Sequence, residues 1–369
     1  VTRMDYANNT YQEWEFDNRK RINHIKIANQ SETITDMKYR LNGVGDILSI
    51  NSNEYKYDGF DRIIGAKTKL PEMVDRLGIV REYFGTEKDK EAINGKLYNI
   101  EADLNNDGRV NGEDHAIASF DDISKIYDIE SFEYDKNGNR TKLVQNGDIY
   151  YYTYGTNNKL LKVELQKKDM LTRKVFALYE YDKNGNTTKR TINKDDGSKS
   201  IIVFTYDTMN RLLTTIENGT KKTEYRYDNA GNRFIKKTDK ELTVYLRHGQ
   251  IAVAMDIEVK YDSTSDYGSI NRYVLSGDLL AGKITKTIKL DNSIVTKKEW
   301  YHLDHLNSTK ATTDEAGKMS TMYEYRAFGE ELKKLGSGDA KYKFQGKELD
   351  EETNLMYFNA RYYDQTIGR

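Results

Sequence analysis

The sequence of 369 residues has no cysteine and a single proline, and its 58 basic and 59 acidic side chains leave a net charge of −1. The lack of cysteine excludes disulfides, thiolate catalysis and cysteine-based zinc sites. The balanced charge gives no large basic field that would attract nucleic acid. No apolar run approaches the roughly 20 residues needed to cross a bilayer, so we expect no membrane span. Residues 1–5 lack the layout of a signal peptide, and we expect the start to be an internal cut.

The composition is polar but not that of a disordered chain. Hydrophobic residues make up 37% of the sequence and include 29 tyrosines, while charged residues make up 32%. Aromatic residues at 11% contradict the composition of segments that cannot fold. We therefore expect a folded protein with little buried core.

A short motif repeats along the chain. The residues Tyr-Asp-Lys-Asn-Gly-Asn-Arg at 134–140 recur with small changes at 181–187 and 227–233. From Tyr134 onward the intervals between copies are 20, 27, 25 and 21 residues, which indicates a repeat with variable loops. Looser copies begin at Phe16, Tyr57, Tyr154 and Tyr206.

Each copy predicts a β-hairpin. A β-branched and aromatic run such as 201–206 precedes the motif, and an alternating run such as 211–216 follows it. The Asp can accept backbone N–H groups ahead of it, and Asn137-Gly138 tolerates the positive φ of a tight turn. The alternative is a generic β-meander in which Tyr occurs only because it favours strands.

The repeat is interrupted between Tyr57 and Tyr134, which lie 77 residues apart. Apolar residues at helical spacing over 72–85, after Pro71, predict a helix. The following loop, 103–114, places oxygen-bearing side chains and a central Gly108 at the positions of a calcium-binding loop that opens a helix. An acidic turn without metal is the alternative. The predicted calcium ligands are Asp103, Asn105, Asp107, the carbonyl of Arg109, Asn111 and Asp114.

The repeats resemble the YD-repeat or RHS (rearrangement hotspot) family, which is related to teneurins and to insecticidal toxin-complex shells. Residues 300–369, with the segments 301–309, 344–350 and 360–369, are similar to the RHS-associated core that closes such shells. They depart from the family at Asn307 and Asn354, where Gly is usual, and at Gln365, where Pro is usual. The resemblance implies antiparallel hairpins that spiral into a hollow shell, with Tyr and Asp side chains stacked from repeat to repeat. Such a shell has a wall one sheet thick with both faces in water, which agrees with the polar composition.

The calcium loop resembles a dockerin repeat with Asp at its last position. Dockerins usually carry two such loops and bind cohesin modules. Here the first half is degenerate, since Gly78 lies where an acidic ligand is expected. The resemblance therefore implies one calcium ion with a structural role, and it leaves cohesin binding open.

The residue types and spacing of His302, Asp304 and His305 come closest to those of a catalytic or metal-binding cluster. On a strand the first two face one side and His305 faces the other, so the three do not converge without a bulge. We expect hydrogen-bonded structural roles for them. Ser308 has no third group at a recognisable spacing to complete a hydrolase triad.

We expect a mainly β protein with a small inserted α-helical module. The predicted domains are YD-repeat strands at 1–64, the dockerin-like EF-hand insert at 65–128, further YD-repeat strands at 129–299 and the RHS-associated core at 300–369. The family resemblance implies a non-enzymatic scaffold, secreted or on a bacterial surface, that encloses and delivers a C-terminal toxin, as in polymorphic toxins. The alternative is a surface-binding module that docks on cohesin or binds glycans. A hydrolase that uses His302 and His305 is a third hypothesis.

Overall fold

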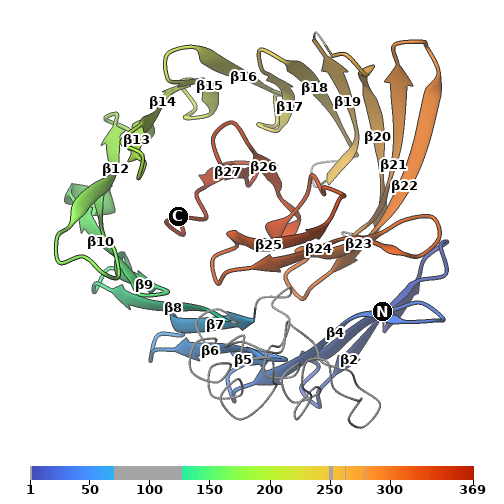
Figure 1. Cartoon of the computed structure of the whole chain (residues 1–369), viewed down its shortest axis with the longest axis horizontal. Helices are drawn as coiled ribbons and strands as arrows, with labels where there is room; N and C mark the ends of the chain where they lie inside the picture. The colour runs from blue at the N-terminus through green and yellow to red at the C-terminus, as the bar shows by residue number, and fades with distance from the viewer. Residues whose placement is uncertain (1, 70–126, 249–251, 262, 278) are drawn as a thin grey trace, which may run out of the picture.

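The structure is a computed structural model that describes residues 2–69, 127–248, 252–261, 263–277 and 279–369. In this part of the chain 25 strands form a single antiparallel sheet in which each strand pairs with the next along the sequence (Figure 1). The mainly β fold is therefore confirmed. The predicted helix at 72–85 and the six calcium ligands lie outside the described residues, and their predictions stay untested.

The strands of the large sheet differ in length, and the longest lie between residues 252 and 303. Two three-residue 3₁₀ turns, η1 (Thr156–Asn158) and η2 (Phe344–Gly346), interrupt the strands. The strands are β1 (Arg3–Asp5), β2 (Tyr11–Phe16), β3 (Ile22–Ala28), β4 (Thr33–Leu41), β5 (Ile47–Ile50), β6 (Asn53–Tyr57), β7 (Ile63–Lys69), β8 (Tyr127–Tyr134), β9 (Arg140–Gln145), β10 (Asp148–Tyr154), β11 (Leu160–Gln166), β12 (Lys174–Tyr181), β13 (Thr187–Asn193), β14 (Lys199–Tyr206), β15 (Leu212–Glu217), β16 (Lys221–Tyr227), β17 (Arg233–Lys237), β18 (Glu241–His248), β19 (Ala252–Lys260), β20 (Asp266–Ser276), β21 (Leu279–Lys289), β22 (Ile294–Leu303), β23 (Thr309–Thr313), β24 (Met319–Tyr325) and β25 (Glu331–Gly336), followed by a separate small sheet of β26 (Glu348–Asp350), β27 (Leu355–Tyr357) and β28 (Tyr362–Tyr363).

All three predicted domain boundaries fall inside strands of the sheet. Strand β7 continues to Lys69 and pairs with β8, which begins at Tyr127, so the predicted insert limits at 65 and 128 fall inside strands. The boundary at 299/300 falls within β22. The backbone ladder continues through all three positions, while the division of the chain into domains stays a prediction.

The Tyr-Asp motif forms a five-residue turn. The Asp135 N–H donates to the Asn139 carbonyl over 2.9 Å, and the Gly138 N–H donates to the Asp135 carbonyl over 3.1 Å. One carboxylate oxygen of Asp135 accepts the N–H groups of Asn137 and Asn139 at 2.8 and 2.9 Å. Gly138 has φ = 80°, which completes a type I turn followed by a left-handed residue. The predicted hairpins are confirmed, with Gly138 rather than Asn137 as the left-handed residue.

In five copies of the motif the Tyr hydroxyl ties the hairpin to the one before it, whereas the hydroxyl of Tyr227 lies 3.3 Å from that of Tyr362 in the plug. In the five copies the hydroxyl donates to a backbone carbonyl of the preceding hairpin, so the ring packs against its neighbour while its polar end is satisfied. The donor and acceptor residues are Tyr57 and Ile47, Tyr134 and Ile63, Tyr154 and Arg140, Tyr181 and Leu160, and Tyr206 and Thr187, at 2.7 to 3.0 Å.

The sheet curves into a ring whose first strands lie beside β22 and β23 (Figure 1). Side chains rather than a backbone ladder make this contact. The buried amide of Gln12 donates to the Leu303 carbonyl over 2.8 Å and accepts the Leu303 N–H over 3.3 Å, as an opposing strand would. Asn8 donates to Thr313 Oγ1 and to the Asp314 carbonyl at 2.9 and 2.7 Å. The ring is therefore held together across about 300 residues of sequence.

The last residues, 337–369, leave the sheet and lie inside the ring (Figure 1), where they contribute the sheet of β26 to β28. We call this segment the plug and the 25-stranded sheet the wall. The plug covers part of the inner face, so the prediction of a wall with two wet faces is wrong for the side that faces the plug. Sequence periodicity cannot reveal this, because it shows which residues share a face and not what covers that face.

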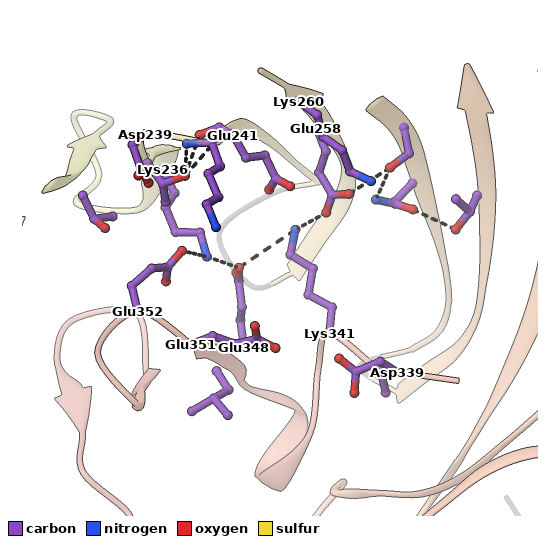
Figure 2. Close-up of a pocket in the computed structure, with 18 of the residues that line it drawn as sticks. Lys236, Asp239, Glu241, Glu258, Lys260, Asp339, Lys341, Glu348, Glu351 and Glu352 are labelled. Atoms are coloured by element: carbon purple, nitrogen blue, oxygen red, sulfur yellow. Dashed lines mark hydrogen bonds and ion pairs between the residues drawn. The ribbon is translucent and has the colours of Figure 1, made fainter. Parts of the chain in front are cut away.

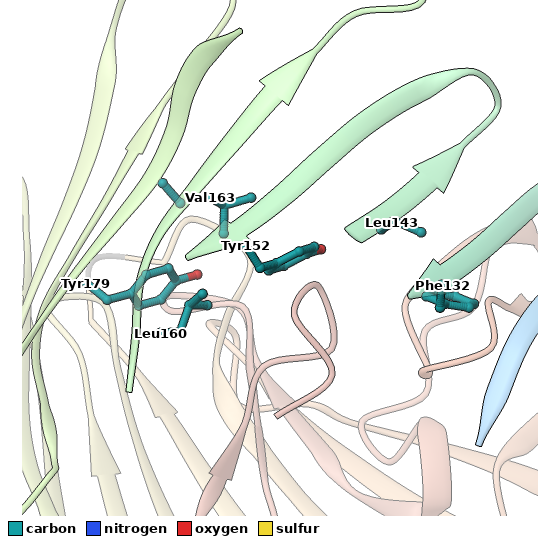
Figure 3. Close-up of a cluster of buried hydrophobic side chains, with 7 residues drawn as sticks. Phe132, Leu143, Tyr152, Leu160, Val163 and Tyr179 are labelled. Atoms are coloured by element: carbon teal, nitrogen blue, oxygen red, sulfur yellow. The ribbon is translucent and has the colours of Figure 1, made fainter. Parts of the chain in front are cut away.

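A hydrophobic cluster on the inner face shows what the plug contacts. Figure 3 shows Phe132, Leu143, Tyr152, Leu160, Val163 and Tyr179, which project from β8 to β12 toward the same side. Phe328 and Ile367 pack against this cluster, and the ring centroids of Phe132 and Phe328 are 5.1 Å apart. This cluster of the inner face is therefore covered in part by Ile367 of the plug and in part by Phe328 from the turn between β24 and β25.

Candidate functional site at the wall and plug interface

Three arginines of the wall hold the plug. They project inward from β9, β13 and β17. Arg140 and Arg233 are the first residues of their strands, whereas Arg190 is the fourth residue of β13. Arg190 donates to Asp364 Oδ2 over 2.9 Å and also to the Thr353 carbonyl. Arg140 donates to the Thr366 carbonyl over 3.4 Å. Because these bonds join strands to a segment more than 160 residues later, they fix where the end of the chain lies.

The third arginine, Arg233, is 1% exposed and binds two carboxylates. Its guanidinium donates to Asp350 Oδ2 over 2.6 Å and to Glu348 Oε2 over 2.8 Å. Tyr245 donates its hydroxyl to the other oxygen of Glu348 over 2.7 Å. Burial alone would raise the pKa of Glu348, but Arg233 and the nearby lysines lower it to about 2. The carboxylate therefore stays charged, which is the condition for a stable buried pair.

Two lysines extend this ionic network, as Figure 2 shows. The Nζ atom of Lys236 lies 3.3 Å from Asp350 Oδ1 and 3.4 Å from Glu352 Oε1. The Nζ atom of Lys341, a plug residue, lies 3.1 Å from Asp256 Oδ2 and 3.0 Å from Glu258 Oε1, both on β19. Burial alone would lower the pKa of both lysines, but the surrounding carboxylates hold it above the usual range.

The network borders a cavity of about 870 Å³ between the inner face of β15 to β21 and the plug. Its lining is polar, with threonines between the charged residues. Nine lysines and nine acidic residues line it, so their formal charges cancel. The charged residues are Glu217, Lys221, Lys222, Lys236, Asp239, Lys240, Glu241, Glu258, Lys260, Asp266, Lys283, Lys289, Asp339, Lys341, Lys343, Glu348, Glu351 and Glu352.

A second attachment joins β8 to the turn between β24 and β25. Arg326 forms a bidentate pair with Asp128 at 2.9 and 3.0 Å. Next to it, Glu130 accepts the Ala327 N–H over 3.2 Å. Burial raises the pKa of Glu130 to about 7, so this carboxyl titrates near neutral pH.

The residues considered for catalysis have separate partners. His302 is fully buried, its Nε2 lies 2.9 Å from Thr313 Oγ1, and burial lowers its pKa to about 3. His305 packs edge-on against Tyr39 with ring centroids 5.1 Å apart. Asp304 accepts two backbone N–H groups of its own turn, at 2.8 Å each. The geometry does not bring the three side chains together.

In the described part of the chain, no group of three or more His, Asp or Glu side chains is arranged to hold a metal ion. Asp103, Asn105, Asp107, Arg109, Asn111 and Asp114 all lie outside that part. Likewise, no helix within the described ranges is long and apolar enough to span a membrane.

The residues that anchor the plug are not evident from the sequence. Arg140 and Arg233 are the last residues of their copies of the motif, which is a visible signal, but the copy at 181–187 ends in Thr187. Their partners, Glu348 and Asp350, lie more than 100 residues away. A repeat reveals the equivalent positions, whereas a single sequence does not reveal which distant carboxylate each of them faces.

Solved structures share this fold at low sequence identity. The crystal structure of the TcdB2-TccC3-Cdc42 complex matches the whole chain with a TM-score of 0.59 and 15% identity, and the chain covers 17% of that protein. At this identity the match concerns the fold alone.

Three curated proteins are similar in sequence over part of the chain. The tRNA3(Ser)-specific nuclease WapA of Bacillus spizizenii is 30% identical over 48% of the chain. Salivary gland surface protein 1 of Aedes aegypti is 26% identical over 66%, and the double-stranded DNA deaminase toxin A of Burkholderia cenocepacia is 27% identical over 48%. The chain spans only 7%, 7% and 14% of the length of these proteins.

A family model covers most of the chain. The model of the teneurin YD-shell matches residues 86–369, which include the strands from β8 onward and the whole plug. The match agrees with the meander of hairpins, the Tyr-Asp turns and the enclosed C-terminal segment. The chain belongs to the teneurin YD-shell family.

Proposed function

We propose that this chain is part of a non-enzymatic shell that encloses a toxin joined to its C-terminal side and carries it out of a bacterial cell. The observation that carries the proposal is the position of the plug. Arg369 lies inside the ring beside Asn139, to which it donates over 3.1 Å (Figure 1). A polypeptide that followed Arg369 would therefore begin on the inner side of the wall.

The relatives support a carrier role. A tRNA nuclease and a DNA deaminase toxin are both similar to this chain, although the activities in their names differ. A region shared by toxins of different chemistry fits a common scaffold better than the active part. The charge-balanced lining of the 870 Å³ cavity also fits, because it offers no large apolar surface on which an enclosed chain would collapse.

The test is protection from protease. An unstructured polypeptide with protease sites is fused after Arg369, and the same polypeptide is fused before Val1 as the matched control. We expect the C-terminal fusion to be cleaved more slowly than the N-terminal one. Equal cleavage of the two fusions would contradict enclosure.

We further propose that residues 103–114 bind one structural calcium ion. The spacing of Asp103, Asn105 and Asp107 supports this proposal. Calorimetric titration should give about one site that is lost in Asp103→Ala and Asp107→Ala. Binding that survives both substitutions would overturn it. A surface-binding role through cohesin or glycans is the competing proposal, and cohesin pull-downs and glycan arrays test it directly.

A further inference from the structure

Two basic side chains that form no ion pair with the described residues face a small cavity between the wall and the plug. The cavity measures about 190 Å³ and is bordered by β18 to β21 and by plug residues 342–348. Arg247 projects from β18, and Lys347 follows the turn that precedes β26. Within the described ranges, neither side chain forms a hydrogen bond or an ion pair with the protein.

This pair differs from the other buried cations at the interface. Arg233, Lys236 and Lys341 each have at least two carboxylates within 4 Å. Glu348, the acidic residue that lines the small cavity, is already bound by Arg233 and by the Tyr245 hydroxyl. Within the described ranges, neither Arg247 nor Lys347 has a carboxylate within ion-pair distance. Asp228 attracts Arg247 from farther away, and the Lys347 ammonium lies 5.5 Å from the centroid of the Phe358 ring.

The two cations also influence each other. Burial and then the charge of Arg247 lower the pKa of Lys347. Like charges repel more strongly in a poorly hydrated site than in water, so keeping both charged here has a free-energy cost. An anion between them would convert this repulsion into two attractive contacts.

Unused hydrogen-bond donors face the same cavity. The Nε of Arg247 and the hydroxyl of Tyr342 are buried without a hydrogen-bond partner. The ring of Tyr342 is fixed edge-on against Tyr273, with centroids 5.1 Å apart. Together with the ammonium group of Lys347, the cavity presents three donor groups, and donors combined with positive charge select a negatively charged acceptor.

We propose that this cavity binds a small oxyanion such as inorganic phosphate, which bridges Arg247 of the wall and Lys347 of the plug. The volume is below the roughly 300–1,000 Å³ of sites for drug-sized ligands, which favours a small ion. Because the two residues belong to different parts of the fold, the bound anion strengthens the attachment of the plug. Its effect on stability grows with anion concentration as for any ligand of the folded state.

The test is the melting temperature of the full chain in increasing sodium phosphate, with sodium chloride at matched ionic strength as the reference. We expect a saturable stabilisation, with an apparent Kd that weakens at least about tenfold, or about 1.4 kcal/mol, in Arg247→Ala and in Lys347→Ala. Arg173→Ala is the matched control, because Arg173 is exposed and stacks on Tyr151. It should leave the response unchanged.

A second readout separates an anion site from a purely structural role. Without phosphate, the two alanine variants should melt at or above the temperature of the parent chain, because each removes one of two repelling charges. A decrease in melting temperature without phosphate, together with an unchanged phosphate response, would overturn the proposal. So would the absence of a saturable response in the parent chain. A parallel titration with acetate distinguishes a site for any oxyanion from one selective for a tetrahedral ion.

Discussion

The Tyr-Asp turns and the plug interface both depend on carboxylates, but these carboxylates have different partners. In a turn, Asp135 accepts N–H groups from residues two and four positions ahead, near the surface. At the interface, Glu348 and Asp350 bind Arg233, which lies 115 and 117 residues away and is almost fully buried. The turns thus define each hairpin locally, whereas the buried pairs decide how the chain end is held inside the ring.

The difference concerns energetics as well as distance. An exposed carboxylate that loses its partner is solvated again, so the cost is small. A buried carboxylate that loses its partner stays in a medium that disfavours charge, so the cost is large. The wall should therefore tolerate substitutions in single turns, and the interface should not tolerate the loss of a single arginine.

The largest expected effect is that of Arg233→Ala. It leaves Glu348 and Asp350 buried without their main cation, and we expect a loss of about 3–5 kcal/mol in the free energy of unfolding. The measurement is a urea titration, with limited proteolysis to detect release of residues 337–369. The control is Arg211→Ala, which removes the partially exposed pair with Asp207 in a turn and should cost about 1 kcal/mol or less. Equal losses in the two variants would remove the distinction between the regions.

The next effect comes from two glycines in equivalent turn positions. Gly329 has φ = 88°, and a Cβ there would lie 2.3 Å from the Phe344 ring of the plug. Gly138 has φ = 80° and open space around it. Gly138→Ala should cost about 1–2 kcal/mol for the left-handed backbone alone. Gly329→Ala should cost about 1–3 kcal/mol more because it also displaces the plug, as thermal melts of the two variants would show. A smaller loss for Gly329→Ala would mean that the plug does not pack against this turn.

A third effect depends on pH through Glu130. Its pKa is raised from 4.5 to about 7 in the folded state, so between these values the folded state retains a proton that the unfolded state releases. Stability should therefore fall as the pH rises through this window, with a slope of at most about 1.4 kcal/mol per pH unit from this group. Glu130→Gln should flatten the slope, as urea titrations at several pH values would show. A slope unchanged by the substitution would exclude Glu130 as its source.

The smallest effect is expected for Tyr181→Phe in the wall. The substitution removes only the hydroxyl that donates to the Leu160 carbonyl over 2.7 Å, so the ring remains packed. We expect a loss of about 0.5–1.5 kcal/mol, measured by urea titration. A loss as large as that of Arg233→Ala would show that the contacts between repeats, and not the interface, dominate stability.

The contacts within the turns can be predicted from the sequence, whereas the long-range contacts at the plug interface cannot. The motif at 134–140 was sufficient to predict hairpins, because the Asp, the Gly and their hydrogen-bond partners lie within five residues. The related turns that begin at Asp304 and Asp314 were not recognised as copies, since Leu303 and Thr313 stand where the motif has Tyr. The pairing of Arg190 with Asp364 was not predictable, because nothing local to either residue specifies the other.

The central claim, that the chain end is held inside the ring beside the Asp135 turn, can be tested directly because the protein has no cysteine. Cysteines are introduced at Asn139 and Arg369, whose side chains lie 3.1 Å apart at their polar atoms, and a short bis-maleimide is added. The control pair combines Arg369→Cys with Lys318→Cys, the equivalent position of the β23 to β24 turn. We predict a rapid intramolecular cross-link between positions 139 and 369 and none between 318 and 369. No cross-link in the first pair, or equal cross-linking in both, would contradict the account.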